Sequence, residues 1–471
     1  MPSKQTRRRV LQVSGVTLAG LLAGCGDDSS GDGAPRQSTD RRTTDRRTPK
    51  TTTATTTIET TETTTEPETE TIETTRISID DCGHRYPLVP TSSAGEFTLQ
   101  HGRQERGTRL LQGTRALFNN NGEHPTMNLE RGPSGGFLDQ LRTTIPAGEG
   151  PHIFQWPHDI AGEFSENGFL SDQRGELRVG ECAFTDAAWD AAQYNGQTIG
   201  LPFAAECPAL IYNEDILEEM GRAPPETFEE WLATMDEYHD PASGKYGLAH
   251  PINAYFVSWA VQAYGADIYD GETDELGITS EEAIQGLNIV LEDLKPYLAA
   301  DPSHMAQASV FQDGNAPFLV NGPWAIAGLE DQGMNIGVTP IPAPEGAVSR
   351  PYSGVQTIFF SRKMNTGGDS ARAAREFAEW YVTNPERLRN LSTNSTYVPV
   401  KTGLAEHMSL PETVVGFAEQ FETSYPMPQN PKMNFVWVPF EQGVLEAFNN
   451  GSDPGPLMAD AAEEIRNAWS S

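Results

Sequence analysis

Several aromatic and acidic residues of this 471-residue chain have the chemistry of a sugar site. Sugar rings have apolar C–H faces that stack on aromatic side chains, and hydroxyl edges that donate hydrogen bonds to carboxylates. The candidates lie at expected strand ends or helix starts; they are Trp156, Asp159, Glu206, Tyr255, Phe256, Trp324 and Trp437. Taken singly, each Trp is more often a core residue than a ligand contact. Because the candidates are far apart in sequence, only a fold can bring them together.

Enzyme signatures are few. The chain has no GxxxxGK[ST] phosphate loop and no HExxH motif, and its nine His do not pair at metal-ligand spacing. One segment, Gly132-Pro133-Ser134-Gly135-Gly136, fits the GxSxG nucleophile elbow, with Ser134 as the nucleophile. The alternative is a Gly-rich turn between a strand and a helix. We favour the turn, because short Gly patterns recur by chance in a chain with 44 Gly.

The elements that must position these residues alternate along the chain. Period-2 and short apolar runs predict strands at 97–99, 127–129, 197–203, 209–212, 336–341 and 355–361. Helical spacing predicts helices at 108–118, from 137, 371–382 and 457–469, and after capping boxes that begin at Thr227 and Thr279, the second running to Tyr297. Strands that alternate with helices over this length predict an α/β fold, usually in two domains.

Charge is strongly unbalanced. The net charge is −33, from 33 basic and 66 acidic residues, and residues 1–50 alone carry +5. The remainder therefore carries −38, which argues against a nucleic-acid partner. Only seven residues are Lys. An acidic, Lys-poor surface is typical of a halophile protein that stays soluble in concentrated salt, although an ordinary acidic secreted protein is the alternative.

The first 25 residues have the features of an export signal. Arg7-Arg8-Arg9 precede a short apolar stretch, which resembles a Tat signal, and Leu22-Ala23-Gly24-Cys25 resembles a lipobox. Lipidation of Cys25 would anchor the protein to the membrane without a spanning helix. Residues 26–80 then form a Thr/Glu-rich tether that is too polar to fold. It resembles O-glycosylated stalks in composition.

Three more cysteines follow, at Cys82, Cys182 and Cys207. Outside the cell two of them could pair and leave one free, and their spacing does not decide which. No CxxC or Cys/His spacing indicates zinc.

Five segments, in order, resemble the bacterial maltose/maltodextrin-binding proteins, a sugar class of extracellular solute-binding proteins. Residues 150–159 (GPHIFQWPHD) are similar to that family's GPDIIFWAHD, and 189–196 (WDAAQYNG) to its WDAVRYNGK. Residues 202–213 are similar to PIAVEALSLIYN, 321–324 match NGPW, and 427–437 resemble MPxxPxMxxxW. The joint match covers roughly 95–471, essentially the whole region expected to fold.

The resemblance implies a periplasmic-binding-protein-like α/β fold of two lobes with ligand in the cleft between them. The solute-binding domain would be 81–471, with the N-lobe at about 95–206 plus 341–402 and the C-lobe at about 207–340 plus 403–471. Hinge crossings would fall near 205–208, 339–343 and 400–405. Trp156 and Asp159 would line the N-lobe wall and Glu206 the hinge. Tyr255 and Phe256 would come from the C-lobe, with Trp324 and Trp437 stacking on sugar rings.

Parts of the family's polar shell are absent. Ile160 replaces an Arg, Asn253 replaces a Glu, and the family's Asp-Lys pair after the first strand has no clear match near 101–104. Its Glu-Glu pair is replaced around 134–136. The retained aromatic set supports a sugar or related oligosaccharide ligand, whereas the changed polar shell does not support maltose itself.

The function that the resemblance implies is that of a monomeric, non-enzymatic binding lipoprotein of an ABC importer, without cofactor or metal. It would act at the extracellular face of the membrane and deliver its ligand to the permease. Lobe closure on the ligand would provide the signal to the permease. Two alternatives stay open: a carbohydrate hydrolase, which needs two carboxylates about 5–10 Å apart, and a surface adhesin on a Thr-rich stalk.

Overall fold

The computed structural model describes residues 86–103, 105–133, 135–402 and 410–470. The predictions for the export signal, Cys25, the tether, Cys82 and Ser134 lie outside these ranges. Within them, no helix is both long and apolar enough to cross a membrane.

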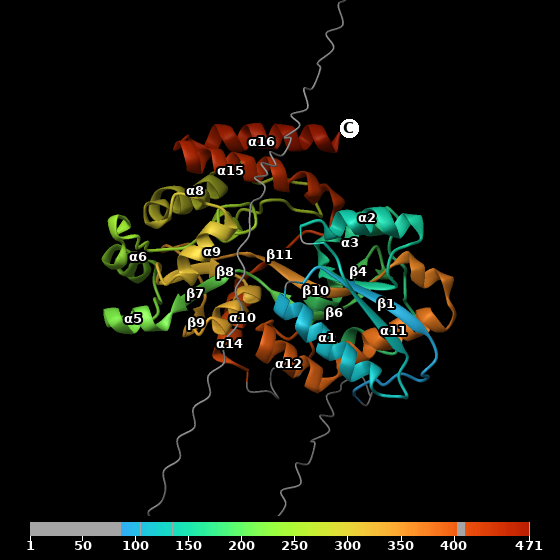
Figure 1. The fold of residues 1–471 in the computed structure, drawn as a ribbon. Helices are drawn as coiled ribbons and strands as arrows, with labels where there is room; N and C mark the ends of the chain where they lie inside the picture. Colours follow the sequence, from blue (N-terminus) through green and yellow to red (C-terminus); the bar gives the residue numbers. More distant parts are fainter. Residues whose placement is uncertain (1–85, 104, 134, 403–409, 471) are drawn as a thin grey trace, which may run out of the picture. The chain divides into compact units, whose positions relative to one another are not determined.

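A six-stranded sheet begins with two β-α-β units (Figure 1). The strands β1 (Glu96–His101), β2 (Thr126–Arg131) and β3 (Ile153–Pro157) are connected by the helices α1 (Glu105–Asn119) and α2 (Phe137–Ala147). Strand β1 lies between β2 and β3 and is parallel to both. The carboxyl ends of all three strands therefore meet at one edge of the sheet, where α/β proteins place their ligands.

Chain segments from further along the sequence complete this sheet. Strand β10 (Tyr352–Phe360) is antiparallel to β3 and to β6 (Gly200–Glu206), and it is parallel to the short β11 (Tyr425–Pro426). Because β6 and β3 both run antiparallel to β10, they run in the same direction. Glu206, the last residue of β6, therefore lies at the same edge as the carboxyl end of β3.

A second sheet has three strands in the order β8 (Phe318–Asn321), β7 (Ala209–Asn213) and β9 (Ile336–Thr339). Strand β7 is antiparallel to both neighbours, and Ala209 pairs with Asn321. The connection from β6 to β7 thus lies beside the end of β8, where α10 (Pro323–Asp331) begins with Pro323-Trp324. This arrangement brings the NGPW segment to the crossing that joins the two sheets.

The helices cover these sheets and form the remaining core. Helix α11 (Gly368–Thr383) packs against β1, and α14 (Glu412–Thr423) packs against β9. The segment α8 (Glu281–Asn288) continues through a π-helical stretch (Ile289–Leu294) and a 3-10 turn (Lys295–Tyr297). The chain ends in α15 (Trp437–Asn450) and α16 (Pro454–Trp469), which pack side by side (Figure 1). Further helices are α3 (Ala161–Glu166), α4 (Asp186–Asp190), α5 (Glu214–Met220), α6 (Phe228–Tyr238), α7 (Ser258–Val261), α9 (His304–Gln312) and α12 (Pro385–Ser395).

Most local predictions agree with these elements, with two corrections. The capping box at Thr227 is present, since Glu230 N donates to the Thr227 hydroxyl while Glu230 also accepts from the Thr227 backbone. The second helix is different: its N-cap is Ser280, which accepts from Ala283 N, so Thr279 opens no capping box. The strand expected at 336–341 ends at Thr339. Pro340 follows it, and proline cannot donate to a strand ladder.

The structure decides which of the two described cysteines forms a disulfide. Cys182 is disulfide-bonded, whereas Cys207 is a free, buried thiol. Burial raises the pKa of the Cys207 thiol, and the neighbouring Glu206 carboxylate raises it further. Cys207 therefore behaves as a small apolar core residue at the crossing between the sheets.

Candidate ligand-binding site

Three of the predicted aromatic residues form one group. Tyr255 and Phe256 lie in the loop before α7, and Trp324 is the second residue of α10. Ring centroids are 5.6 Å apart for Tyr255 and Phe256, 6.2 Å for Tyr255 and Trp324, and 6.4 Å for Phe256 and Trp324. Trp324 is 37% exposed, which is unusual for a Trp that has two aromatic neighbours. An open indole beside two other rings is suited to stacking on a sugar.

Trp437, the first residue of α15, approaches the same loop from another element. Its ring lies 5.6 Å from that of Tyr352, in an edge-to-face arrangement. One helical turn later, Glu441 Oε2 accepts from the backbone N–H of Ala254 at 3.4 Å. Residues four apart share a helix face, so this bond places the Trp437 face of α15 beside the 254–256 loop.

Trp156 lies apart from this group among the described residues. It is near the end of β3 and contacts Phe137 at a centroid distance of 5.7 Å. It also packs close to Gly102, where an added Cβ would come within 2.9 Å of the indole. The shared feature of Trp156 and Asp159 is their position at the carboxyl edge of the six-stranded sheet.

Asp159 and Glu206 form an acidic pair at this edge. Burial raises the pKa of Asp159 to about 7; hydrogen bonds from backbone N–H groups oppose this, and the Glu206 and Glu163 carboxylates add to it. Burial likewise raises the pKa of Glu206 to about 7. A hydrogen bond from Gln356 Nε2 to Glu206 Oε1, 2.9 Å long, partly opposes that rise. Near neutral pH each carboxyl can therefore either donate or accept a hydrogen bond.

Tyr255 connects the aromatic group to the acidic pair. Burial raises the pKa of the Tyr255 hydroxyl well above its usual value, and the carboxylates of Glu206 and Asp159 raise it further. An electrostatic effect of this kind requires the phenol and the two carboxyls to be neighbours. Tyr255, Glu206 and Asp159, which are spread over 97 positions of the chain, therefore lie near one another.

Two residues that the sequence did not identify complete the polar part of the site. Arg103 follows β1, its Nε donates to Gln155 Oε1 at 3.0 Å, and its guanidinium lies 5.4 Å from the ring centroid of Tyr397. Gln356 lowers the pKa of Glu206 most, and Arg103 and the Tyr397 hydroxyl lower it by smaller amounts. The position of Arg103, directly after the first strand, was a signal that could have identified it. Tyr397 had none, because its role depends on the long-range contact of 398 with Ala205.

Four polar atoms in this region are buried without a hydrogen bond of normal geometry. They are two acceptors and two donors: Asp159 Oδ1, Glu206 Oε2, Arg103 Nη2 and Gln155 Nε2. A buried polar group without a partner costs about 1–3 kcal/mol, so native structures rarely leave several together. Hydroxyl groups, which donate and accept at the same atom, could satisfy both kinds.

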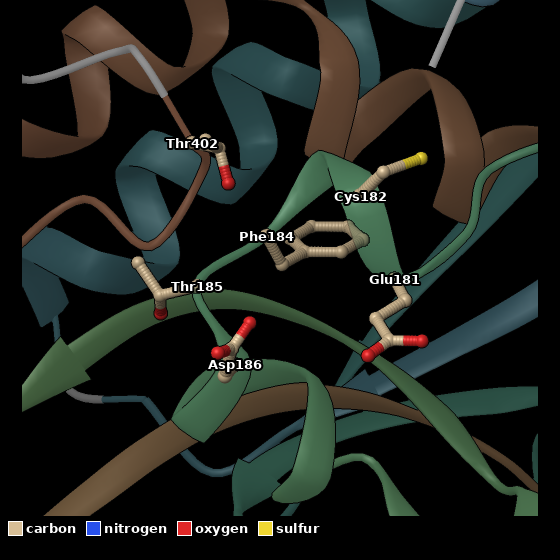
Figure 2. Close-up of a pocket in the computed structure, with 6 residues that line it drawn as sticks. All are labelled: Glu181, Cys182, Phe184, Thr185, Asp186 and Thr402. Atoms are coloured by element: carbon tan, nitrogen blue, oxygen red, sulfur yellow. The ribbon is translucent and has the colours of Figure 1, made fainter. Parts of the chain in front are cut away.

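A separate hollow of about 700 Å3 lies elsewhere (Figure 2). It is lined by Glu181, Cys182, Phe184, Thr185, Asp186 and Thr402, and it includes none of the predicted site residues. Thr402 is the last described residue before 403–409. We place no ligand there, because the unpartnered buried polar atoms lie at the sheet edge instead. No cluster of three or more His, Cys, Asp or Glu among the described residues could hold a metal ion.

The protein has an α/β fold with a six-stranded and a three-stranded sheet, joined where β6 passes into β7 beside the candidate residues Glu206 and Trp324. Residues 115–414 match the family model described as bacterial extracellular solute-binding protein, and the chain belongs to this family. The resemblance predicted from the sequence motifs, and the fold class with it, are therefore confirmed.

Particular relatives carry sugar-binding names. The chain is 37% identical, over 338 residues, to the maltotriose-binding protein of Pyrococcus abyssi; the match covers 69% of this chain and 72% of that protein. It is 26% identical to the galactooligosaccharide-binding protein of Bacillus subtilis, over 70% of this chain and 79% of that one. The fold is similar to that of a Thermus thermophilus maltotriose-binding protein with bound maltotriose, with a TM-score of 0.70 at 23% identity, covering 79% of this chain and all of that one.

Proposed function

We propose that this protein captures a maltooligosaccharide, or a closely related oligosaccharide, as the substrate-binding component of an ABC importer. The supporting observation is the group of Tyr255, Phe256 and Trp324 rings, which is linked through the effect of Glu206 and Asp159 on the Tyr255 pKa to the sheet edge with its unpartnered buried polar atoms. Rings would stack on the C–H faces of successive sugars, and the polar atoms would bind their hydroxyls. The names of the relatives favour α-linked glucose oligomers over other sugars.

Each predicted site residue has a part in this proposal. Trp324, Trp437 and Trp156 would form stacking walls, and Tyr255 and Phe256 would extend the first of them. Asp159 and Glu206 would accept hydrogen bonds from hydroxyls, each worth about 1.5–3 kcal/mol when a charged group takes part. Arg103 would keep Glu206 ionised for that purpose.

Binding would act through closure of two lobes built around the two sheets. We place the crossings where β6 passes into β7, between β9 and β10, and near Val400. A ligand that contacts both lobes stabilises only the closed form, so it shifts the equilibrium by its differential affinity. The transport machinery would read that closed form; chemical conversion of the ligand forms no part of the proposal.

The same proposal includes the export features of the chain. Tat-type export, lipidation at Cys25 and a polar tether over 26–80 would hold the binding domain at the outer face of the membrane. The acidic, Lys-poor composition would keep it soluble in concentrated salt.

The test is a thermal-shift and calorimetry screen of the purified protein in multimolar KCl. The panel holds maltose, maltotriose, longer dextrins, trehalose, galactooligosaccharides and amino acids. A ligand at 100 times its dissociation constant should stabilise the protein by about 2.7 kcal/mol. Stabilisation by α-glucans supports the proposal, and stabilisation by another sugar alone changes its specificity. No response to any sugar contradicts it; release of shorter sugars would point to the hydrolase, and binding only to polymers or cells to the adhesin.

A further inference from the structure

Arg387 is a buried cation without an ionic partner. It lies in the first turn of α12, its side chain is 5% exposed, and no carboxylate of the described residues forms an ion pair with it. One nitrogen, Nη2, donates to the Tyr381 hydroxyl, and the guanidinium carbon lies 4.2 Å from the centroid of that ring. Nε and Nη1 are buried and donate to nothing in the described chain.

A second guanidinium packs on Phe203, the aromatic residue that contacts Tyr381. Phe203 and Tyr381 are in edge-to-face contact at 5.4 Å, and Arg103 lies 5.2 Å from the Phe203 centroid. The two cations are close enough to repel one another, since Arg103 lowers the pKa of Arg387 in addition to the larger effect of burial. Arg103 also has an unpartnered buried nitrogen, Nη2.

The surroundings offer these cations little negative charge. Burial raises the pKa of Glu206 to about 7, although Arg103 lowers it, so this carboxylate is only partly ionised at neutral pH. The amino end of α12 adds a further positive potential around Arg387, because the helix dipole points its positive end there. A guanidinium cannot lose its proton to relieve this, unlike a buried Lys or His.

Burying a charge without compensation costs several kcal/mol, so a native protein pairs it or binds a counter-ion. From the two free donors on Arg387, the excess positive charge and the absence of an ion pair among the described residues, we propose that Arg387 holds a small monovalent anion of the chloride class. The anion accepts from Nε and Nη1 and neutralises the Arg387–Arg103 region behind the sugar site. This site is independent of the function proposed above.

The test compares anions at constant cation and ionic strength. Thermal unfolding of the purified protein is followed in mixtures of KCl and potassium gluconate, because gluconate is too large for a buried halide position. We expect a melting temperature about 2 °C or more higher in chloride, rising to saturation as chloride is titrated in. Arg387→Met keeps side-chain length while removing the charge and the donors, and should abolish the chloride-specific increment. Arg389→Met, which alters an exposed Arg of the same helix, should retain it.

A second measurement does not need the variant to fold. Crystals of the unaltered protein grown in KBr should show anomalous bromide scattering within hydrogen-bond distance of Arg387 Nε and Nη1. Equal melting temperatures in the two salts, or the same chloride increment in Arg387→Met, would overturn the proposal. So would water, in place of bromide, at these nitrogens.

Discussion

Arg106 in α1 binds Asp331 at the end of α10, with 3.0 Å between Nη1 and Oδ1. The same nitrogen donates to the carbonyl oxygen of Ala327 at 2.7 Å. Helix α1 connects β1 and β2 of the six-stranded sheet. Helix α10 comes directly after β8 of the three-stranded sheet and carries Trp324. The contact therefore joins the two proposed lobes on the helix that presents a candidate stacking residue.

Replacing Arg106 should accelerate ligand release. We expect Arg106→Gln to raise the dissociation rate of maltotriose roughly three- to tenfold, because contacts made only in the closed form add about 0.5–1.5 kcal/mol to it. Stopped-flow fluorescence measures that rate. The control is Arg109→Gln. Arg109 contacts the same Asp331 carboxylate, but its side chain is 59% exposed and its contact is longer, at 3.4 Å, so it should contribute little. Equal rates in both variants would show that this contact does not contribute to closure.

Trp324→Ala should remove affinity with little loss of stability. The exposed indole has few core contacts to lose, whereas stacking on a sugar contributes about 1.5–3 kcal/mol, which corresponds to roughly a 10- to 100-fold weaker Kd. Isothermal titration with maltotriose measures the affinity. Trp189 stacks on Phe184 with centroids 6.0 Å apart, outside the site, and makes a matched control. Trp189→Ala should lower the melting temperature and leave Kd unchanged; the reverse pattern would place the site elsewhere.

Arg103→Met should weaken binding more than tenfold, because it removes a free donor and the cation that favours ionised Glu206. The substitution keeps much of the apolar packing against Phe203 and Tyr397. Calorimetry at several pH values measures the affinity for maltotriose. The loss of affinity should be smaller above pH 8, where Glu206 is ionised even without Arg103. A pH-independent loss would indicate that Arg103 acts only as a donor.

Glu206 should make the ligand-free protein less stable as pH rises. Its folded pKa of about 7 exceeds the usual 4.5, so the folded state holds more protons between these values, and stability falls across that window. The full effect is about 3 kcal/mol. Buried histidines such as His158, with a pKa lowered to about 4 by burial, act in the opposite sense.

The measurement is therefore the difference in unfolding free energy between the unaltered protein and the Glu206→Gln variant. Urea unfolding of the unaltered protein and of Glu206→Gln, from pH 4.5 to 8, cancels the contribution of the histidines. The variant should gain relative stability as pH rises through this range. A flat difference would mean that Glu206 stays ionised in the folded protein.

Cys207 should be chemically inert until the protein unfolds, because its thiol is buried and its pKa is raised. A thiol reagent should label the same number of thiols in the folded unaltered protein and in the folded Cys207→Ala variant. In urea the unaltered protein should label one thiol more than the variant. A native difference would contradict the buried position.

Much of the fold followed from local patterns. The Thr227 capping box begins α6 as expected because its two bonds are made within four residues, whatever surrounds them. The short apolar runs at 97–99 and 127–129 became β1 and β2, whose pairing with each other is non-local but whose apolar pattern is visible in the sequence. The NGPW segment was recognised by its match to the family motif, and its Pro begins α10 at a position where a missing N–H costs nothing.

Other features depended on contacts that local patterns do not encode. Thr279 was expected to open a helix, yet the chain uses Ser280, and one residue of shift depends on how the preceding turn packs. Arg103 was noted only as a departure from the family pattern. Tyr397 and Gln356 reach Glu206 across 191 and 150 positions, and no spacing rule predicts such neighbours.

The amino-acid sequence by itself determined which residue types were available: scattered indoles, two acids at strand ends, and an acidic, Lys-poor surface. It also determined most of the strands and helices, since periodicity is a local property of the chain, although not where each of them begins or ends. Only the tertiary structure decided which residues became neighbours. Strand β10 returns antiparallel between β3 and β6, and this places Glu206 beside Asp159. Packing of α12 likewise buries Arg387 where no carboxylate of the described residues pairs with it. Burial and neighbouring charge shift pKa values, and both depend on contacts between distant segments.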